Sequence, residues 1–213
     1  IKLRLMVAAA TISRNLIEDN GLSVSNKFCK AGGGISIVRS DSLSDPYMFT
    51  SKIEDNIISN NWASSYGGGL CVVSGAHIIA DNVLSQNYAY QGGGGYMGDG
   101  AHTITGNIVS ENRSLLSGGG LHLEGGAHTI TGNIVRDNKS SAGGGLYLAS
   151  GAHAITGNNI PNNEASQYGG GIYVKSGVHT IADNVFSHNS ASQGGGGLLL
   201  ADGTHIIMSN TIN

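Results

Sequence analysis

The sequence has little of what usually marks a function at first sight. Only 12% of its 213 residues are charged, and the net charge of −3 gives no overall electrostatic attraction to nucleic acid or to an anionic membrane. Proline occurs only at Pro46 and Pro161. No apolar run approaches the roughly 18 residues that a membrane-spanning helix requires. These absences exclude several protein classes, so the fold has to be inferred from what repeats along the chain.

The two cysteines, Cys29 and Cys71, are too few for a disulfide-stabilised scaffold. Cys29 lies three residues before one glycine-rich cluster, whereas Cys71 lies two residues after the next cluster. Because these are different positions of the repeat described below, we expect their Cα atoms to lie farther apart than the ~7 Å limit for a disulfide. We therefore predict that the two thiols do not pair directly.

The chain is dominated by a repeat of 25 or 26 residues. An isoleucine recurs at this spacing, at Ile53, Ile79, Ile104, Ile130, Ile155, Ile181 and Ile207. Each isoleucine is followed three residues later by an asparagine, at Asn56, Asn82, Asn107, Asn133, Asn158, Asn184 and Asn210. A second asparagine follows five residues after the first, at Asn61, Asn87, Asn112, Asn138, Asn163 and Asn189. A fixed period of this length indicates a solenoid, in which one supersecondary unit stacks on the next.

Glycine is abundant, with 35 residues, and most of it falls in seven clusters. The clusters span residues 32–34, 67–69, 92–95, 118–120, 143–145, 169–171 and 194–197. This distribution differs from the every-third-residue spacing of collagen and from a flexible linker, which has no hydrophobic pattern. We expect the clusters to lie where the backbone needs a positive φ or packs closely against a neighbour.

Residues Gly118–Ala142 show how one unit is expected to fold. Short extended segments at 121–123, 128–131 and 134–135 are separated by turns. Segments this short cannot fold alone, but each can pair in parallel with its copy about 4.8 Å away in the next unit. The sequence therefore predicts an all-β fold, a right-handed parallel β-helix of about eight coils that forms a single domain over residues 1–213.

Alternation along the segments assigns one apolar set to the core. The inward positions are Leu121, Leu123, Ile130 and Val135, with the equivalents Leu146, Leu148, Ile155, Ile160, Ile172, Val174, Ile181, Phe186, Leu198, Leu200 and Ile207. The asparagine columns also have a structural explanation. Asparagine tolerates the left-handed conformation that a sharp corner needs, and its amide can bond to the copies above and below. We interpret both columns as structural ladders.

The start of the chain belongs to the same repeat. Residues 11–20 match the pattern of residues 103–112, so Ile12, Asn15 and Asn20 are expected to anchor the first coil. A strand within residues 3–10 is expected to lead into it.

The second coil is irregular, with insertions at about residues 21–31 and 38–52. Their acidic residues Asp41 and Asp45 are interpreted as part of a solvated loop. Neither end of the chain has a polar capping unit, although terminal repeats of solenoids normally do. This favours either a longer parent chain or head-to-tail stacking of subunits.

The pattern Ile-x-x-Asn-x-(Ile/Val)-x-x-Asn, followed by Gly-Gly-Gly-(Leu/Ile), extends from about Ile12 to Asn213. It resembles the right-handed parallel β-helix repeats of the pectate-lyase-like superfamily. Within that group it is most similar to surface proteins with polymorphic outer-membrane-type repeats, whose Phe-x-x-Asn motif occurs at residues 186–189. The catalytic motifs of pectate lyases and polygalacturonases are not present in the sequence. The resemblance implies an extracellular scaffold rather than an enzyme.

Six of the eight histidines form one column, at His77, His102, His128, His153, His179 and His205. Stacked imidazoles can bind a metal or titrate near pH ~6.5. However, the flanking residues are Ala, Thr and Ile, and not the carboxylates or thiolates that a metal site also needs. We predict a stacked corner column whose rings bond to backbone carbonyls, with no metal site and no cofactor.

The outward positions after the glycine clusters are predicted to be Ser36, Cys71, Met97, His122, Tyr147, Tyr173 and Leu199. Of these, Met97, His122, Tyr147, Tyr173 and Leu199 form the candidate binding face, because apolar and aromatic side chains on a flat sheet can stack on sugars or dock another chain. The alternative interpretation is ring stacking from coil to coil without any ligand.

A threonine set is also expected to point outward, at Thr103, Thr105, Thr129, Thr131, Thr156 and Thr180. Regular Thr-x-Thr on a β-solenoid resembles ice-binding faces, but only two coils have the full pair.

Paired acids are scarce, and no two of them recur on adjacent coils at the ~5–9 Å separation that glycoside hydrolysis needs.

The sequence therefore predicts a non-catalytic, secreted or cell-surface scaffold that is structural or adhesive. Its partners are expected to be a glycan or a protein surface on an outward face, or further copies stacked head to tail, with no nucleic acid. The alternative is a carbohydrate-active enzyme of the lyase, hydrolase or epimerase type on the same fold. A remote alternative is an ice-binding protein.

Overall fold

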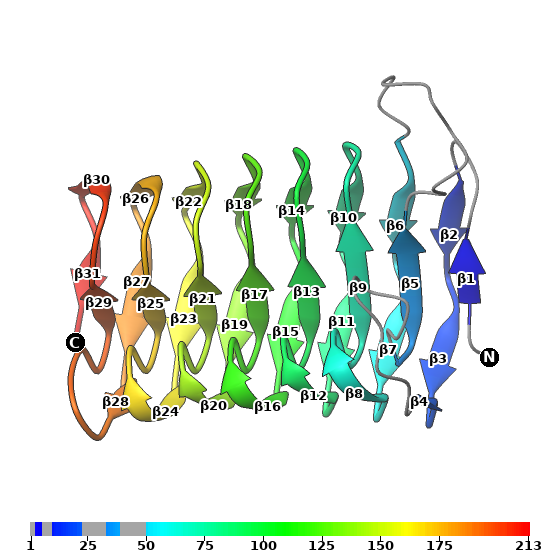
Figure 1. Ribbon diagram of the computed structural model, residues 1–213, viewed down its shortest axis with the longest axis horizontal. Helices are drawn as coiled ribbons and strands as arrows, with labels where there is room; N and C mark the ends of the chain where they lie inside the picture. The colour runs from blue at the N-terminus through cyan, green and yellow to red at the C-terminus, as the bar shows by residue number, and fades with distance from the viewer. Residues whose placement is uncertain (1–2, 6–9, 23–32, 39–49) are drawn as a thin grey trace.

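The computed structural model describes residues 3–5, 10–22, 33–38 and 50–213 (Figure 1). In these ranges the regular secondary structure consists of 31 β-strands, β1 to β31, which form four parallel sheets. The strands follow one another around a coil, and successive coils stack along the long axis (Figure 1). The predicted all-β parallel β-helix is confirmed. Across the same ranges, no helix is long and apolar enough to cross a membrane.

We name the four sheets A to D in the order in which the chain enters them. Sheet A consists of β1 (Leu3–Leu5), β5 (Ile35–Val38), β9 (Leu70–Val73), β13 (Gly95–Met97), β17 (Leu121–Leu123), β21 (Leu146–Leu148), β25 (Ile172–Val174) and β29 (Leu198–Leu200). Sheet B consists of β2 (Thr11–Ser13), β6 (Lys52–Glu54), β10 (Ile78–Ala80), β14 (Thr103–Thr105), β18 (Thr129–Thr131), β22 (Ala154–Thr156), β26 (Val178–Ala182) and β30 (Thr204–Met208).

Sheets C and D complete each coil. Sheet C consists of β3 (Leu16–Glu18), β7 (Ile57–Ser59), β11 (Val83–Ser85), β15 (Ile108–Ser110), β19 (Ile134–Arg136), β23 (Asn159–Pro161), β27 (Val185–Ser187) and β31 (Thr211–Ile212). Sheet D consists of β4 (Gly21–Leu22), β8 (Trp62–Tyr66), β12 (Tyr88–Gln91), β16 (Arg113–Ser117), β20 (Lys139–Ala142), β24 (Glu164–Tyr168) and β28 (Ser190–Ala191).

The strand register explains the period of the sequence. Ile104 of β14 pairs with Ile79 of β10 on one side and with Ile130 of β18 on the other. The spacing of 25 or 26 residues is therefore the length of one coil. The register continues across the irregular second coil, because Ile12 of β2 pairs with Ile53 of β6. This confirms that Ile12 belongs to the first coil.

Sheets A, B and C correspond to the three predicted extended segments, but sheet D was not predicted. The inward residues of sheet D are small, at Ala63, Ala89, Ser114, Ser140 and Ala165, and all of them are buried. Small and partly polar residues give no apolar alternation, so this strand carries no hydrophobic signal in the sequence.

The core is the continuous apolar column enclosed by the sheets. The predicted inward residues from Leu121 to Phe186 are all buried in it. The three predicted members on the last coil are less covered, and Leu200 and Ile207 are each 40% exposed because this coil has a neighbour on one side only. Each coil thus depends on its neighbours for burial, as expected of a solenoid.

The glycine clusters fill the corner between sheets D and A. Gly118 has a φ of 65°, which a side chain disfavours. Gly119 has no room for a side chain, since a Cβ there would lie 2.4 Å from the carbonyl oxygen of Gly144. Both predicted reasons for glycine, a positive φ and close backbone packing, are confirmed.

The asparagine ladders bond the corners from coil to coil, as predicted. The Asn133 Nδ2 donates to Asn158 Oδ1 at 3.0 Å and to the Ile104 carbonyl at 2.9 Å. Its Oδ1 accepts from the backbone N–H of Asn107 at 2.9 Å and from the Asn107 Nδ2 at 3.0 Å. Every polar atom of this amide group is therefore bonded inside the protein.

The left-handed conformation lies on a different residue from the one predicted. The residue immediately before each ladder asparagine has the positive φ, as in Asp55 at 55°, Gly132 at 65° and Asp137 at 58°. The asparagines themselves are not left-handed. The corner thus separates two tasks, because one residue makes the sharp turn and the next one satisfies the polar groups that the turn leaves unpaired.

The prediction that the cysteines remain unpaired is wrong. Cys71, on β9, is disulfide-bonded. The argument from repeat columns fails here because Cys29 falls in the segment predicted to be an insertion, to which the repeat assigns no positions. Cys29, Asp41 and Asp45 lie outside the described residues.

Candidate functional site

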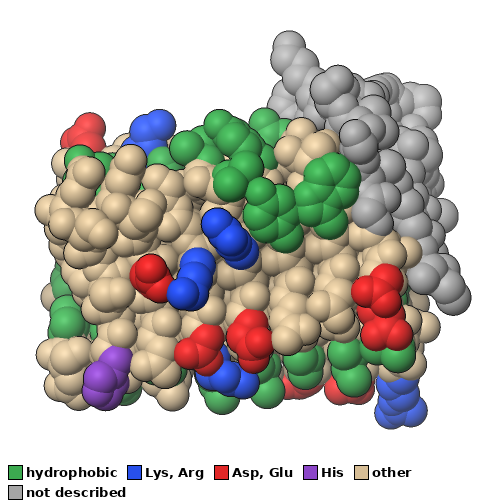
Figure 2. All heavy atoms as spheres, turned by 90° about the horizontal axis from the view of Figure 1, so that it is seen from below, with side chains coloured by type: hydrophobic (Ala, Val, Ile, Leu, Met, Phe, Trp, Pro, Cys, Tyr) green, Lys and Arg blue, Asp and Glu red, His purple; other side chains and the backbone are tan. Residues whose placement is uncertain are grey.

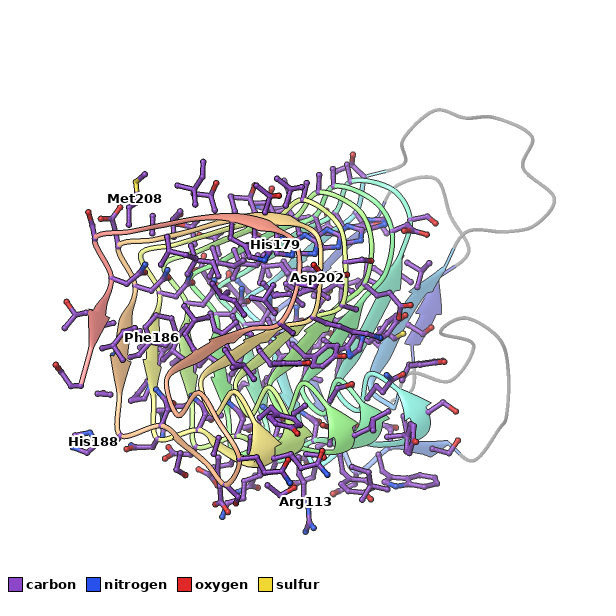
Figure 3. The ribbon with its side chains drawn as sticks, turned by 60° about the vertical axis from the view of Figure 1, so that its left-hand side comes forward. Arg113, His179, Phe186, His188, Asp202 and Met208 are labelled. Atoms are coloured by element: carbon purple, nitrogen blue, oxygen red, sulfur yellow. The ribbon has the colours of Figure 1, made fainter. Side chains whose placement is uncertain are left out.

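The histidine column lies inside the corner at which the chain enters sheet B. The six rings stack with centroids between 4.7 and 5.2 Å apart. Figure 3 shows this row of rings inside the helix, with His179 labelled. The rings from His77 to His179 are buried. The predicted stacked corner column is therefore confirmed.

Hydrogen bonds define which nitrogen of each ring carries the proton. The backbone N–H of His102 donates to Nδ1 of His128 at 3.2 Å, and that of His128 donates to Nδ1 of His153 at 3.2 Å. Since Nδ1 is an acceptor, a neutral ring must carry its proton on Nε2. The Nε2 of His77 lies 2.8 Å from the Ser74 carbonyl oxygen, and that of His179 lies 2.8 Å from the Ser176 carbonyl oxygen. These two contacts match the predicted bonds to backbone carbonyls.

Burial keeps the column neutral. Desolvation, together with the neighbouring histidines, lowers the pKa of His102, His128 and His153 to about 3. Desolvation also lowers the pKa of His77 and His179. At neutral pH every one of these rings is uncharged, and its Nδ1 lone pair accepts a backbone N–H. The role of these rings is therefore structural.

The predicted binding face lies on the outer side of sheet A, with one correction. Met97 is fully buried in the core, and Tyr96 occupies the outward position. The pairing of Gly95 with Leu121 and of Tyr96 with His122 shows the cause. The glycine cluster 92–95 has four members, and its last glycine takes the core position that a leucine fills in the next coil.

The remaining predicted residues do form one ladder. Tyr96, His122 and Tyr147 stack with centroids 5.1 and 4.9 Å apart and nearly parallel planes. Tyr147 and Tyr173 lie 5.2 Å apart with planes tilted by 48°. Leu199 follows Tyr173 in register and is half-buried. Because the rings stack along the axis, their faces cover one another and mainly their edges face outward.

A cluster of polar side chains lies next to Tyr96 and His122 of this ladder. The Tyr96 hydroxyl donates to Glu124 Oε2 at 2.6 Å, and His122 Nε2 lies 3.6 Å from the same oxygen. His122 Nδ1 lies 2.9 Å from Ser117 Oγ. The neighbouring His122 and the Tyr96 hydroxyl hold the pKa of Glu124 at about 2, so its carboxylate is ionised. The proton of His122 therefore belongs on Nε2, facing this carboxylate.

This cluster contains a serine, a histidine and a glutamate, the residue types of a nucleophilic triad. However, Ser117 and His122 are both buried, so neither side chain can reach a substrate. Desolvation also lowers the pKa of His122, which keeps the ring neutral. A shallow pocket of about 210 Å³ lies beside the cluster and is lined by Val73, Tyr96, Asp99, Glu124 and Ser150, among others.

Sequence reasoning missed Tyr96 and Glu124. Glu124 has an apolar or basic equivalent on the following coils, Ala149 and Lys175, so it does not belong to the repeat pattern. A departure from the repeat at an outward position was the only available signal. Its meaning depended on knowing that Tyr96, which is 28 residues away in sequence, lies next to it.

The threonine set lies on the outer side of sheet B in two columns. One column contains Thr103, Thr129, Ala154 and Thr180, and the other contains Thr105, Thr131, Thr156 and Ala182. The predicted outward position of these threonines is confirmed, since their strands pair in register and each threonine is at least partly exposed. Alanine interrupts both columns.

Throughout the described ranges, no three His, Cys, Asp or Glu side chains gather closely enough to hold a metal ion. A family model described as "Periplasmic copper-binding protein (NosD)" matches residues 13–213. No curated protein and no solved structure matches the chain.

Proposed function

Because this chain belongs to the NosD family, whose description is "Periplasmic copper-binding protein", we propose that it is a non-catalytic β-helical scaffold of the cell envelope. The family description supports a location in the envelope, in agreement with the secreted or cell-surface location expected from the sequence. The exact compartment is part of the proposal.

One observation carries the scaffold function: the polar side chains that repeat on every coil are bonded to other parts of the same protein. The ladder asparagines bond to one another and to backbone carbonyls. The histidines accept backbone N–H groups through Nδ1. Side chains used in this way stabilise the stack and have little capacity left for a ligand or a reaction.

Copper binding, which the family description names, is not supported by the part of the chain that the structure describes. Copper coordinates an unprotonated histidine nitrogen. In the five rings from His77 to His179, Nδ1 accepts a backbone N–H, so the proton of the neutral ring is on Nε2. The donor set of this column therefore does not fit a copper ion.

The alternative of a carbohydrate-active enzyme, expected to use residues of the inserted loop, has one candidate among the described residues: Glu124, the ionised carboxylate beside the pocket. Glycosidases of the common type need a second carboxyl group with a raised pKa to act as the acid. Asp99 lines the same pocket, but Ser117 and His122 are buried, so the serine and histidine beside Glu124 cannot act on a substrate. The geometry supports binding at this face better than turnover.

We therefore also propose that a ligand contacts the outer side of sheet A. Tyr147 and Tyr173 are half-buried, and the tilt between them leaves part of each ring uncovered. Ring edges and hydroxyl groups suit hydrogen bonds to a glycan or contacts with a partner chain. His122 is buried and acts as support beneath them.

A turnover assay tests the scaffold function against the enzyme. The purified chain is incubated with a panel of neutral and acidic polysaccharides, and new reducing ends and unsaturated products are measured. We expect no turnover by the protein or by Glu124→Gln. Turnover by the protein that Glu124→Gln abolishes, while its unfolding temperature stays close to that of the parent, would overturn the scaffold function.

A further inference from the structure

The outward bulge of sheet D carries exposed apolar side chains that the scaffold does not need. In β12, a register shift between Ala89 and Gln91 places Tyr90 opposite Leu115 and Leu116 of β16. These side chains are 44%, 52% and 41% exposed. On the other side of β12, the same shift brings Ser64 and Ser65 of β8 opposite Tyr90.

The equivalent positions on other coils show what the fold requires there. They are Ser64, Ser65, Ser141, Ser166 and Gln167, all small or polar. A serine at this bulge is therefore sufficient for the β-helix. Two leucines and a tyrosine at the same place cost solubility without adding to the core, which indicates an interaction surface.

Cations and a further aromatic ring lie beside this bulge. The next outward column of sheet D contains Trp62, Tyr88, Arg113, Lys139 and Glu164, paired in register. Trp62 is 38% exposed. Lys139 pairs with Glu164 at 2.7 Å, whereas Arg113 has no ion pair among the described residues.

The views of the molecule agree with this arrangement. Figure 2 looks at the side that carries sheet D and shows hydrophobic side chains next to two basic ones. Figure 3 labels Arg113, which points away from the helix into solvent. We call Trp62, Tyr90, Arg113, Leu115, Leu116 and Lys139 the corner patch.

We propose that the corner patch docks the protein onto an anionic lipid bilayer. Tryptophan and tyrosine favour the headgroup region, leucines can enter the acyl boundary, and arginine or lysine binds anionic headgroups. The patch protrudes at a bulged corner, a shape that suits a soft interface. The chain-wide charge predicts no such attraction, but Arg113, which has no ion pair among the described residues, supplies a local positive charge beside the apolar side chains, while Lys139 is paired with Glu164.

A glycan fits the corner patch less well. The two leucines offer no hydrogen bonds to sugar hydroxyls. Membrane docking also goes beyond the scaffold function and does not depend on it, because it is measured with lipid and not with polysaccharide turnover.

The test uses Trp62, the one tryptophan of the chain, as a reporter inside the patch. The full chain is mixed with vesicles of equal parts phosphatidylglycerol and phosphatidylcholine, and with vesicles of phosphatidylcholine alone. We expect co-sedimentation with the anionic vesicles and a blue shift of the Trp62 emission, both reduced at high salt.

Variants separate the contributions of the patch. Leu115→Ser with Leu116→Ser installs the residues found at Ser64 and Ser65, and we expect partitioning at least about tenfold weaker. Arg113→Gln should weaken binding about fivefold on anionic vesicles only. The control is Val178→Ser on β26, a residue that is 62% exposed on another face and whose change should have no effect.

The unfolding temperature of each variant is measured first, and Arg113→Gln together with the Trp62 shift decides the question if the double serine variant does not fold. Absence of any Trp62 shift with anionic vesicles overturns the proposal, as does a folded double serine variant that binds like the parent. A Trp62 response to soluble dextran or alginate without a response to vesicles also overturns it, and assigns the patch to a glycan.

Discussion

At the scale of single residues, each corner of the helix divides its work between two neighbours. The first residue makes the turn with a positive φ, and its identity varies among Asp, Gly, Gln, Glu and others. The second residue is the ladder asparagine, whose side-chain amide, as in Asn133, makes four hydrogen bonds to backbone and side-chain groups on adjacent coils. Only the second position needs one particular side chain, which explains why asparagine and not its predecessor repeats so strictly.

This division predicts a specific cost for Asn133→Ala. The change removes the Asn133 bonds to the Ile104 carbonyl and the Asn107 backbone N–H in a buried corner, so we expect a loss of about 1–3 kcal/mol in the free energy of unfolding. The matched control is Asn159→Ala, at an exposed outward position of β23, which should change the free energy by less than about 0.5 kcal/mol. Chemical denaturation measures both. Equal effects of the two changes would mean that the hydrogen bonds of the ladder do not stabilise the fold.

Two glycines with different roles give a second prediction. A Cβ on Gly119 would lie 2.4 Å from the Gly144 carbonyl oxygen, whereas a Cβ on Gly132 would meet nothing within 4 Å. Gly119→Ala should therefore cost about 1–3 kcal/mol or more by forcing coils apart. Gly132→Asn should cost less than about 1 kcal/mol, because asparagine tolerates a positive φ. Denaturation curves compare the two variants, and a well-tolerated Gly119→Ala would contradict the packing role of the cluster.

At the scale of elements, the histidine column shows how a repeated titratable side chain can remain uncharged and serve structure alone. Each ring from His77 to His179 accepts a backbone N–H through Nδ1, and burial favours its neutral form. An element built in this way makes the stability of the protein depend on pH, although it contains no switch in the ordinary sense.

The sign of this dependence follows from the lowered pKa values. His102, His128 and His153 have a pKa of about 3 in the folded state, below the ~6.5 of an unfolded histidine. The unfolded chain therefore binds protons that the folded chain does not, and stability falls as pH drops from about 6.5 toward 3. Each ring contributes up to about 1.4 kcal/mol per pH unit in this window. Denaturation between about pH 7 and 5 should show His128→Gln with a shallower slope than the parent. Asn159→Ala, which removes no titratable group from an exposed position, should keep the parent slope, and the proposed effect fails if His128→Gln keeps it too.

The same column should not take up metal. The Nδ1 lone pairs of His128 and His153 are used by backbone N–H groups, so calorimetric titration with Cu²⁺, Zn²⁺ or Ni²⁺ should show no stoichiometric binding by these rings. His128→Gln combined with His153→Gln is the comparison. Submicromolar stoichiometric binding that disappears in this double variant would show that the rings are ligands after all.

At the scale of the whole molecule, the period of the sequence predicts the fold because one coil has one length and one register. Side chains at equivalent positions must then share an environment, which is why Ile130 and its copies identify the core. Prediction fails where a strand shows no hydrophobic pattern or where the repeat is interrupted. The inward residues of sheet D, such as Ala89, are small and show no hydrophobic pattern. Gly95 is a fourth glycine that takes an inward position, so counting from the glycine cluster places Met97 outward instead of Tyr96.

The candidate site could be predicted less well than the fold, for the same reason. A site consists of departures from the repeat, such as Glu124 or Leu115, and the sequence does not say which departures lie next to each other. The disulfide of Cys71 was missed because it involves a segment outside the repeat. Contacts between coils decide these cases, and they depend on the side-chain arrangement that the stack creates.

The equivalence of the coils gives a last prediction, for the molecule as a unit. Deleting residues 133–157 removes one complete period and joins Gly132 to Asn158, the in-register copy of Asn133. The asparagine and histidine ladders then continue from Asn107 and His128 into the next coil without a break. We expect a folded β-helix that is shorter by one coil, with the same type of circular dichroism spectrum and a lower free energy of unfolding, because stability in a solenoid sums over coils and their interfaces. Deleting only residues 133–142 removes β19 and β20 but leaves the rest of that coil, which then lacks its strands of sheets C and D and cannot close. This variant should lose much more of its free energy of unfolding than the full-period deletion. If both deletions behaved alike, the coils would not be interchangeable units, and the register between neighbours would not be what holds the molecule together.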